Sequence, residues 1–396
     1  MGEALVPTLF RLVSRISSAI LPGAVSNQDT EQAPQLDMEV LNCRVELTKQ
    51  EKENPISDVF AVKICGSIHA PDDTHYTSLK ISIMDITGGV SEATPVHARI
   101  KQWQMPAHHT SGGQDSPVFC YNAEIGKLPQ QTTILSDWTT VAQLHLEWLI
   151  FPRKGKRNLQ FHTSILSRES GKEIAYAKCN FTYENTEFGH IDLQENISRT
   201  KALAVPLAFA VSAADRKLHR REIDLIKNWT RSSIDLSKAP DEVMRELDRA
   251  LDKTVAFFRD GNQVNVHKIC KELVGIASLA QRYDILELCL YVAQADGLAA
   301  VEELAILKNL ANWLEVDADR FRSMMEKILP ASMHEVKDTE VILGVTSDMD
   351  KEKSRRQLNK EYIKWHSRVT NSDPQIRAQA DQMLMMIADA RSQYVG

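Results

Sequence analysis

Two stretches of this 396-residue chain repeat one pattern of acidic residues. Asp215 and Glu222 stand seven residues apart, and so do Asp296 and Glu303. In each stretch the Asp follows an apolar run and the Glu opens an amphipathic one, which predicts two helix–turn–helix units with similar acidic turns. Two carboxylates held near helix ends could chelate a hard divalent ion such as magnesium, calcium or manganese.

The same four residues also fit a purely structural role. An Asp can turn the chain, and a Glu in the first turn of a helix is favoured by the positive end of the helix dipole. Turn chemistry alone therefore explains the spacing. Metal binding and ligand-free capping remain alternatives for both stretches.

The second stretch resembles a known family. Its apolar helix, its acidic turn and the end of its next helix read Tyr291-Val-Ala-Gln-Ala-Asp-Gly, Glu302-Glu303 and Trp313-Leu-Glu-Val. This run is similar to the TerB-like (tellurite-resistance) helical domain. The resemblance covers 199–330 and implies an all-α bundle whose acidic loops bind metal, in proteins linked to bacterial stress and phage-resistance systems. The first stretch departs from the pattern, because Arg216 stands where a Gly is expected.

Composition places the chain among soluble, multidomain proteins. The length predicts two or three domains, and 43% hydrophobic with 25% charged residues is typical of globular proteins. The net charge of −6 is spread along the chain, so no nucleic-acid partner is expected. The six cysteines show no Cys-x-x-Cys spacing, which argues against zinc knuckles and disulfide scaffolds and favours buried thiols in a reducing compartment.

The N-terminal segment, 1–35, predicts an amphipathic helix followed by a polar linker. Pro22-Gly23 ends the helix. Its apolar and basic faces are carried by Leu9, Arg11, Val13, Arg15, Ile16 and Ile20. Such a helix docks on this protein or on a second copy of it, or it lies on a membrane surface. The expected location is cytoplasmic, with peripheral association at the inner membrane as the alternative.

Residues 36–190 predict an antiparallel β-sandwich of about eight strands. Apolar and polar residues alternate in runs such as 59–66, 79–84 and 144–151, and Gly, Pro and Asp clusters separate the runs. Asp72, Asp73 and Asp85 are candidate calcium ligands, but three loop acids are few for a calcium cage, and turn residues are the preferred interpretation. The sandwich is predicted to be a protein-binding module.

Residues 199–330 are expected to be helical throughout. One long amphipathic helix is predicted from Asp241 toward Phe258. Another is predicted over 264–280, with Leu279 among its core positions.

The C-terminal region, 334–396, carries a second resemblance. A run beginning Val341-Ile-Leu-Gly-Val, a basic helix ending at His366 and a closing helix together resemble the J-domain of DnaJ-type co-chaperones. The resemblance is to a degenerate J-domain, because Ser367 and Arg368 replace the Pro and Asp of the His-Pro-Asp motif that chaperone stimulation needs. The remaining basic face predicts an acidic protein partner and consists of Arg355, Arg356, Lys360, Lys364 and His366.

Together these patterns predict a multidomain α and β protein: an antiparallel β-sandwich, an all-α TerB-like bundle and a small J-like helical hairpin. No nucleophile–base pair, phosphate loop or dinucleotide motif is present, so no enzyme activity is expected. The predicted function is an adaptor or scaffold in a bacterial stress or phage-resistance assembly, with a divalent cation at the acidic loops. The alternatives are a divergent DnaJ-type co-chaperone that delivers clients and a peripheral membrane-surface protein held by the N-terminal helix.

Overall fold

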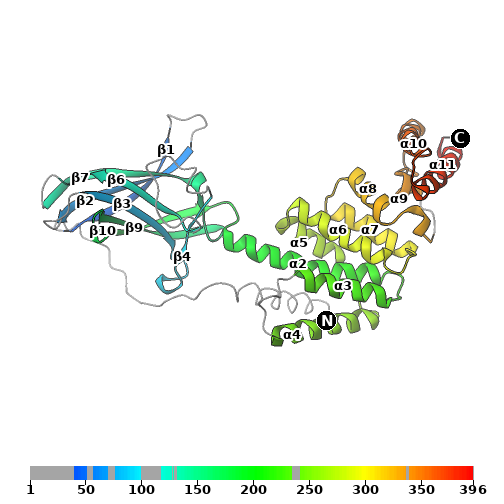
Figure 1. The fold of residues 1–396 in the computed structure, drawn as a ribbon, viewed down its shortest axis with the longest axis horizontal. Coiled ribbons are helices and arrows are strands. Elements are labelled where there is room, and N and C mark those ends of the chain that lie inside the picture. The colour runs from blue at the N-terminus through cyan, green and yellow to red at the C-terminus, as the bar shows by residue number, and fades with distance from the viewer. Residues whose placement is uncertain are drawn as a thin grey trace. The chain divides into compact units, whose positions relative to one another are not determined.

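The computed structural model describes residues 40–50, 57–69, 76–99, 117–126, 128, 132–233, 241–335 and 339–395. The chain divides between Gln194 and Glu195 into two compact units. The first consists mainly of strands and the second consists of helices (Figure 1). The predicted N-terminal helix, with Leu9, Arg11, Val13, Arg15, Ile16 and Ile20, lies outside the described residues.

The strand unit is built from antiparallel sheets. Its strands are β1 (Asn42–Gln50), β2 (Ser57–His69), β3 (Thr77–Asp85), β4 (Thr94–Pro95), β5 (His97–Ala98), β6 (Cys120–Gly126), β7 (Thr132–His145), β8 (Leu149–Ile150), β9 (Gly155–Ser167) and β10 (Glu173–Asn185). One sheet has the order β1-β2-β7. The second has the order β10-β9-β3-β4, with β6 also paired to β3. The pair β5-β8 forms a third, small sheet.

An aromatic cluster joins the two larger sheets. Phe60 of β2 points across to the second sheet. Its ring lies edge-on to those of Phe161 and Phe181, with distances between ring centroids of 5.3 and 5.5 Å. Buried Val62 and Ile81 belong to the same apolar cluster. Alternation along the strands explains this arrangement, because every second side chain of β3 is buried. Face-to-face sheets with a shared core are the predicted β-sandwich.

One predicted strand is wrong in detail. The run 144–151 is not a continuous strand, because a 3₁₀ turn over Leu146–Trp148 separates the end of β7 from β8. The strand β7 itself, which pairs with β2 over most of its length, was not predicted. A second short 3₁₀ turn spans Val90–Glu92.

The helical unit follows from α2 onward. Its helices are α2 (His190–Ser212), α3 (Arg220–Ser233), α4 (Asp241–Arg259), α5 (Val266–Ile276), α6 (Leu279–Gln294), α7 (Val301–Trp313), α8 (Ala318–Ile328), α9 (Thr339–Leu343), α10 (Lys351–His366) and α11 (Pro374–Tyr394), with a 3₁₀ turn at Ala331–Met333. The middle of α2, from Ala202 to Val211, is buried on all sides in one apolar cluster shared by α2 to α8. A helix that is apolar all round is expected at the centre of such a bundle.

The predicted helix over 264–280 is in fact two helices. Helix α5 ends at Ile276, and Ser278 caps α6 by accepting a hydrogen bond from the Gln281 amide at 3.3 Å. The Gln281 side-chain oxygen in turn accepts a hydrogen bond from the Ser278 amide at 2.8 Å, which completes a capping box. Leu279 is therefore not a core residue of α5. It is 48% exposed in the first turn of α6.

The last three helices share a core of their own, and α10 and α11 form a helical hairpin within it. Helices α10 and α11 pack along each other around the fully buried Trp365, together with Leu358, Met383 and Ile387. Asp350 and Asp373 cap the two helices by accepting from backbone amides at 2.7 and 2.8 Å. The predicted fold class, with antiparallel sheets followed by a helical bundle and C-terminal helices, is confirmed. No described helix has the length and apolar character needed to cross a membrane.

Candidate functional site

The first acidic turn connects α2 to α3. Glu222 is the third residue of α3, and its Oε2 accepts hydrogen bonds from the Ser212 hydroxyl at 2.6 Å and from the His219 amide at 3.1 Å. Asp215 accepts from the Lys217 amide at 2.7 Å, which tightens the turn. Glu222 is only 1% exposed although it lies at a helix terminus. The carboxylate of Glu222 therefore lies inside the bundle and stabilises the turn through these hydrogen bonds.

The second acidic turn connects α6 to α7 and repeats these contacts. Glu303, also the third residue of its helix, accepts from the Ala300 amide at 2.9 Å, and Asp296 accepts from the Leu298 amide at 3.1 Å. Glu303 is 3% exposed. Both motifs thus use the Glu to bond the amide before the helix and the Asp to bond the amide two residues ahead. The predicted capping role of these residues is what their contacts show.

The structure brings the two turns together. His219 of the first turn lies 3.6 Å from the carboxylate of Asp296 in the second. The pKa of Glu303 is raised to about 8, chiefly by burial and also by the nearby carboxylates of Glu222, Asp215 and Asp296, while the hydrogen bond from the Ala300 amide acts in the opposite direction. Burial likewise raises the pKa of Glu222, although its bonds from Ser212 and His219 act in the opposite direction. Four acids separated by up to 88 residues, from 215 to 303, therefore form one cluster.

The turns differ at the position after the Asp. Gly297 has a φ of 96°, a conformation that glycine adopts without steric cost. The matching residue in the first turn is Arg216, which has a φ of 66°. A side chain in this left-handed region costs about 1–2 kcal/mol. The first turn therefore keeps the backbone shape of the second but carries strain that the second does not.

Comparison with known families selects the same part of the chain. Residues 200–326 match the family model of tellurite resistance protein TerB. The match begins within α2 and ends within α8, so it contains both acidic turns. No curated protein and no solved structure matches the chain.

The donor chemistry of the TerB-matching region suits a hard cation, because all four acids offer carboxylate oxygens. Two of them, Glu222 and Glu303, are buried, and the raised pKa of Glu303 favours its protonated form. In their present orientations the side chains bond backbone amides instead. Within the described ranges, no three Asp, Glu, His or Cys side chains converge as a metal site.

The predicted basic face of α10 divides into two parts. Lys360 and Lys364 point toward α8 of the TerB-matching region, where Lys360 Nζ lies 3.0 Å from Asp319 and Lys364 pairs with Glu326. Arg368 also approaches Glu326, at 3.5 Å. This part of the basic face thus pairs with acidic residues of α8 in the same chain.

The other basic residues of α10 point elsewhere. Arg355, Arg356 and His366 are exposed. Arg356 pairs with Glu352 one turn earlier, at 3.1 Å, and the His366 ring lies 5.4 Å from that of Tyr362. These three side chains are therefore accessible to solvent on the surface of α10.

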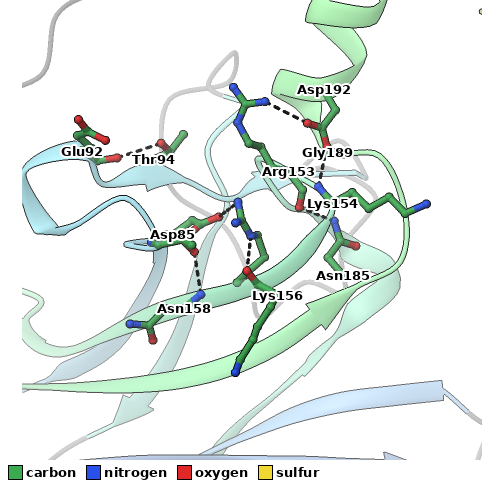
Figure 2. A network of polar contacts seen from close by, with 12 residues as sticks. Asp85, Glu92, Thr94, Arg153, Lys154, Lys156, Asn158, Asn185, Gly189 and Asp192 are labelled. Carbon is green, nitrogen blue, oxygen red and sulfur yellow. Dashed lines mark hydrogen bonds and ion pairs between the residues drawn. The ribbon is translucent and has the colours of Figure 1, made fainter. Parts of the chain in front are cut away.

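Polar contacts at one end of the strand unit decide the role of Asp85. This side chain is 4% exposed, bonds the Thr87 amide at 3.0 Å and lies 3.5 Å from the Arg157 guanidinium. It belongs to a network of contacts rather than to a group of acids (Figure 2). Asp72 and Asp73, the other two candidate calcium ligands, lie outside the described residues.

The same view shows a half-buried carboxylate that the sequence did not single out. Asp192 bonds the amides of Lys154 at 2.6 Å and Gly189 at 3.0 Å and pairs with Arg153 at 3.2 Å (Figure 2). Gly189 has no room for a side chain, since a Cβ there would lie 2.1 Å from the Pro152 carbonyl. This network fastens the first turn of α2 to the 152–154 segment, which is a structural role.

Proposed function

We propose that this chain is a non-enzymatic adaptor in a tellurite-resistance-related stress or phage-resistance assembly, and that its acidic cluster binds a regulatory divalent cation. The match of residues 200–326 to TerB supports a role related to tellurite resistance. The observation that carries the metal part is the meeting of two equivalent acidic turns, with two buried glutamates facing one cluster.

A bound cation would act as a cross-link. Asp215 and Glu222 from one turn and Asp296 and Glu303 from the other are the residues that would hold it. The ion would neutralise carboxylates that now repel one another and would connect α2–α3 to α6–α7. Metal would then change the stability of the bundle, and with it the surface offered to partners.

The adaptor part rests on surfaces rather than on chemistry. The β-sandwich and the exposed residues of α10, Arg355, Arg356 and His366, are the proposed partner contacts. The protein is proposed to work in the cytoplasm. Membrane-surface binding through residues 7–21 is the alternative, and it predicts liposome binding that Arg11→Glu combined with Ile16→Asp abolishes.

The co-chaperone alternative draws on the hairpin of α10 and α11. Its weakness is local: Ser367 caps the end of α10, and Arg368 is held by Glu326 and lies over the Trp365 ring at 4.5 Å. A side chain engaged within its own chain cannot replace the Asp of the His-Pro-Asp motif. We therefore expect no stimulation of a heat-shock ATPase by the full chain.

Calorimetry on the full chain tests the metal proposal. An ion that binds only the folded state adds about 2.7 kcal/mol to the free energy of unfolding at 100 times its dissociation constant. We expect magnesium, calcium or manganese to raise the midpoint temperature of thermal unfolding of the helical unit. The double variant Asp296→Asn/Glu303→Gln should remove that shift. Glu302→Gln is the matched control, because Glu302 is the exposed neighbour of Glu303.

Titration calorimetry on the same proteins gives a second, direct reading. Heat of binding in the wild type and in the Glu302 variant, but not in the double variant, supports the proposal. Absence of both binding heat and a midpoint shift with all three ions contradicts it. The four acids would then be capping residues alone, and the adaptor role would depend on protein contacts.

A further inference from the structure

Two thiols meet where the edges of the sandwich come together. Cys43 lies in β1, an end strand of the β1-β2-β7 sheet, and Cys179 lies in β10, an end strand of the facing sheet. Their sulfur atoms are 2.9 Å apart although 136 positions separate them in the chain. Both residues are half-buried and carry free thiols.

The contact is held by strand pairing on both sides. Cys43 stands opposite Ile64 of β2, and Cys179 stands opposite Phe161 of β9. Both thiols also pack against the apolar core of the sandwich. The hydroxyl of Thr163, a fully buried residue of β9, lies 3.5 Å from the Cys43 sulfur. The two sulfurs are therefore positioned by the β1–β2 and β9–β10 strand pairs, not by flexible loop ends.

We propose that Cys43 and Cys179 form a reversible disulfide that joins β1 to β10 when the protein meets a two-electron thiol oxidant such as hydrogen peroxide. A disulfide is about 2.05 Å long. The sulfurs need to approach by only about 0.9 Å from their present separation, so no strand has to change its register.

The surroundings assign different roles to the two thiols. The hydrogen bond from the Cys179 thiol lowers the pKa of Cys43, and the Thr163 hydroxyl adds to this effect against the influence of burial. The pKa of Cys179 is raised, first by its bond to Cys43 and then by burial. Because the thiolate is the nucleophile, Cys43 reacts first and Cys179 second.

The reaction balances with one peroxide for each disulfide. The Cys43 thiolate attacks one peroxide oxygen and becomes a sulfenic acid, and the other oxygen leaves as hydroxide and takes a proton to form water. The Cys179 sulfur then attacks the Cys43 sulfur and loses its proton, and the sulfenic oxygen leaves as a second water. Two thiols are oxidised by two electrons and the peroxide is reduced. An external dithiol reverses the bond by exchange.

The other cysteines provide internal controls. Burial raises the pKa of Cys65 and of Cys120, and it raises the pKa of Cys270 to about 12. Burial also raises the pKa of the fully buried Cys289. Among the six cysteines of the chain, only Cys43 combines a lowered pKa with a sulfur neighbour from the other sheet.

Mass spectrometry of the folded full chain tests the proposal. After peroxide treatment and alkylation under denaturing conditions, we expect two of the six thiols to be lost and one cross-linked peptide to contain Cys43 and Cys179. Dithiothreitol should restore all six. Cys120→Ser is the matched control, since Cys120 is a half-buried strand cysteine, and it should form the cross-link as the wild type does.

Single variants test the order of reaction. In Cys179→Ser the sulfenic acid at Cys43 should persist and be trapped by dimedone, whereas in Cys43→Ser residue 179 should remain a thiol. The proposal is overturned if wild-type protein keeps six thiols at a peroxide dose that oxidises a low-pKa thiol standard. It is also overturned if the lost thiols belong to another pair or if the bond joins two chains.

Discussion

Glu303 makes the stability of the helical unit depend on pH in a direction opposite to that of most carboxylates. Its pKa in the folded protein is about 8, whereas the ordinary value is 4.5. The folded state therefore binds the proton more tightly than the unfolded state does. The free energy of unfolding is highest below the ordinary value and falls as pH rises toward 8.

The magnitude follows from the two pKa values. Each unit of difference corresponds to about 1.36 kcal/mol, so the full shift corresponds to about 5 kcal/mol. Most of this change, about 3–4 kcal/mol, falls between pH 5 and pH 8. Glu303→Gln removes the ionisation but keeps an acceptor for the Ala300 amide. The variant should match the wild type near pH 5 and exceed it by a few kcal/mol at pH 8.

Urea unfolding at four pH values between 5 and 8, followed by far-ultraviolet circular dichroism, measures this difference. Glu302→Gln, a change at an exposed residue, serves as the control. Its free energy of unfolding should depend on pH in the same way as that of the wild type. If the curves of Glu303→Gln and wild type are parallel across this range, Glu303 does not carry a raised pKa. The account of a buried acidic cluster would then be wrong.

Two pairs of substitutions test the turns and the contact between α10 and α8. Arg216→Gly should raise the free energy of unfolding by about 1 kcal/mol, because it removes a side chain from the left-handed region. The reverse change in the second turn, Gly297→Ala, should lower it by about the same amount. Changes of the same sign for the two substitutions in chemical denaturation would contradict the assigned strain. Glu326→Gln should destabilise the helical unit by about 1–2 kcal/mol, because half-buried Lys364 and Arg368 lose their shared partner. The exposed Glu315→Gln, which removes a pair with Arg282, should change the same unfolding free energy by less than about 0.5 kcal/mol.

Periodic patterns allowed the fold class to be predicted, and local irregularities limited the detail. The alternation along β3 and the apolar run from Ala202 to Val211 of α2 predicted the correct elements, because each of these patterns is long and uninterrupted. Strand β7 was not predicted because both of its faces carry exposed residues over most of its length, so it shows no clear alternation. The break between α5 and α6 depends on a capping box at Ser278, a short signal inside an otherwise continuous apolar pattern.

The candidate site was predictable in part for the same reason. The spacing of Asp215 and Glu222, repeated in Asp296 and Glu303, predicted both turns and their bonds. It did not show that the turns meet, because that depends on how α3 packs against α6. Nor could it show that Lys360 and Lys364 bind α8, or that Cys43 meets Cys179. Each of these contacts joins residues distant in the sequence, and no local pattern records it.

The register of the sandwich has a consequence for the order in which the chain folds. In β3 and β9, Ile83 pairs with Phe161, 78 positions later, and Cys43 meets a residue still farther away. Pairings between such distant segments form slowly, whereas helices that pack on their sequence neighbours assemble fast. The unit that leaves the ribosome first is thus expected to complete its folding last. Until the two sheets pack together, Cys43 in β1 and Cys179 in β10 are not neighbours, so their disulfide is expected to form only after the sandwich has closed.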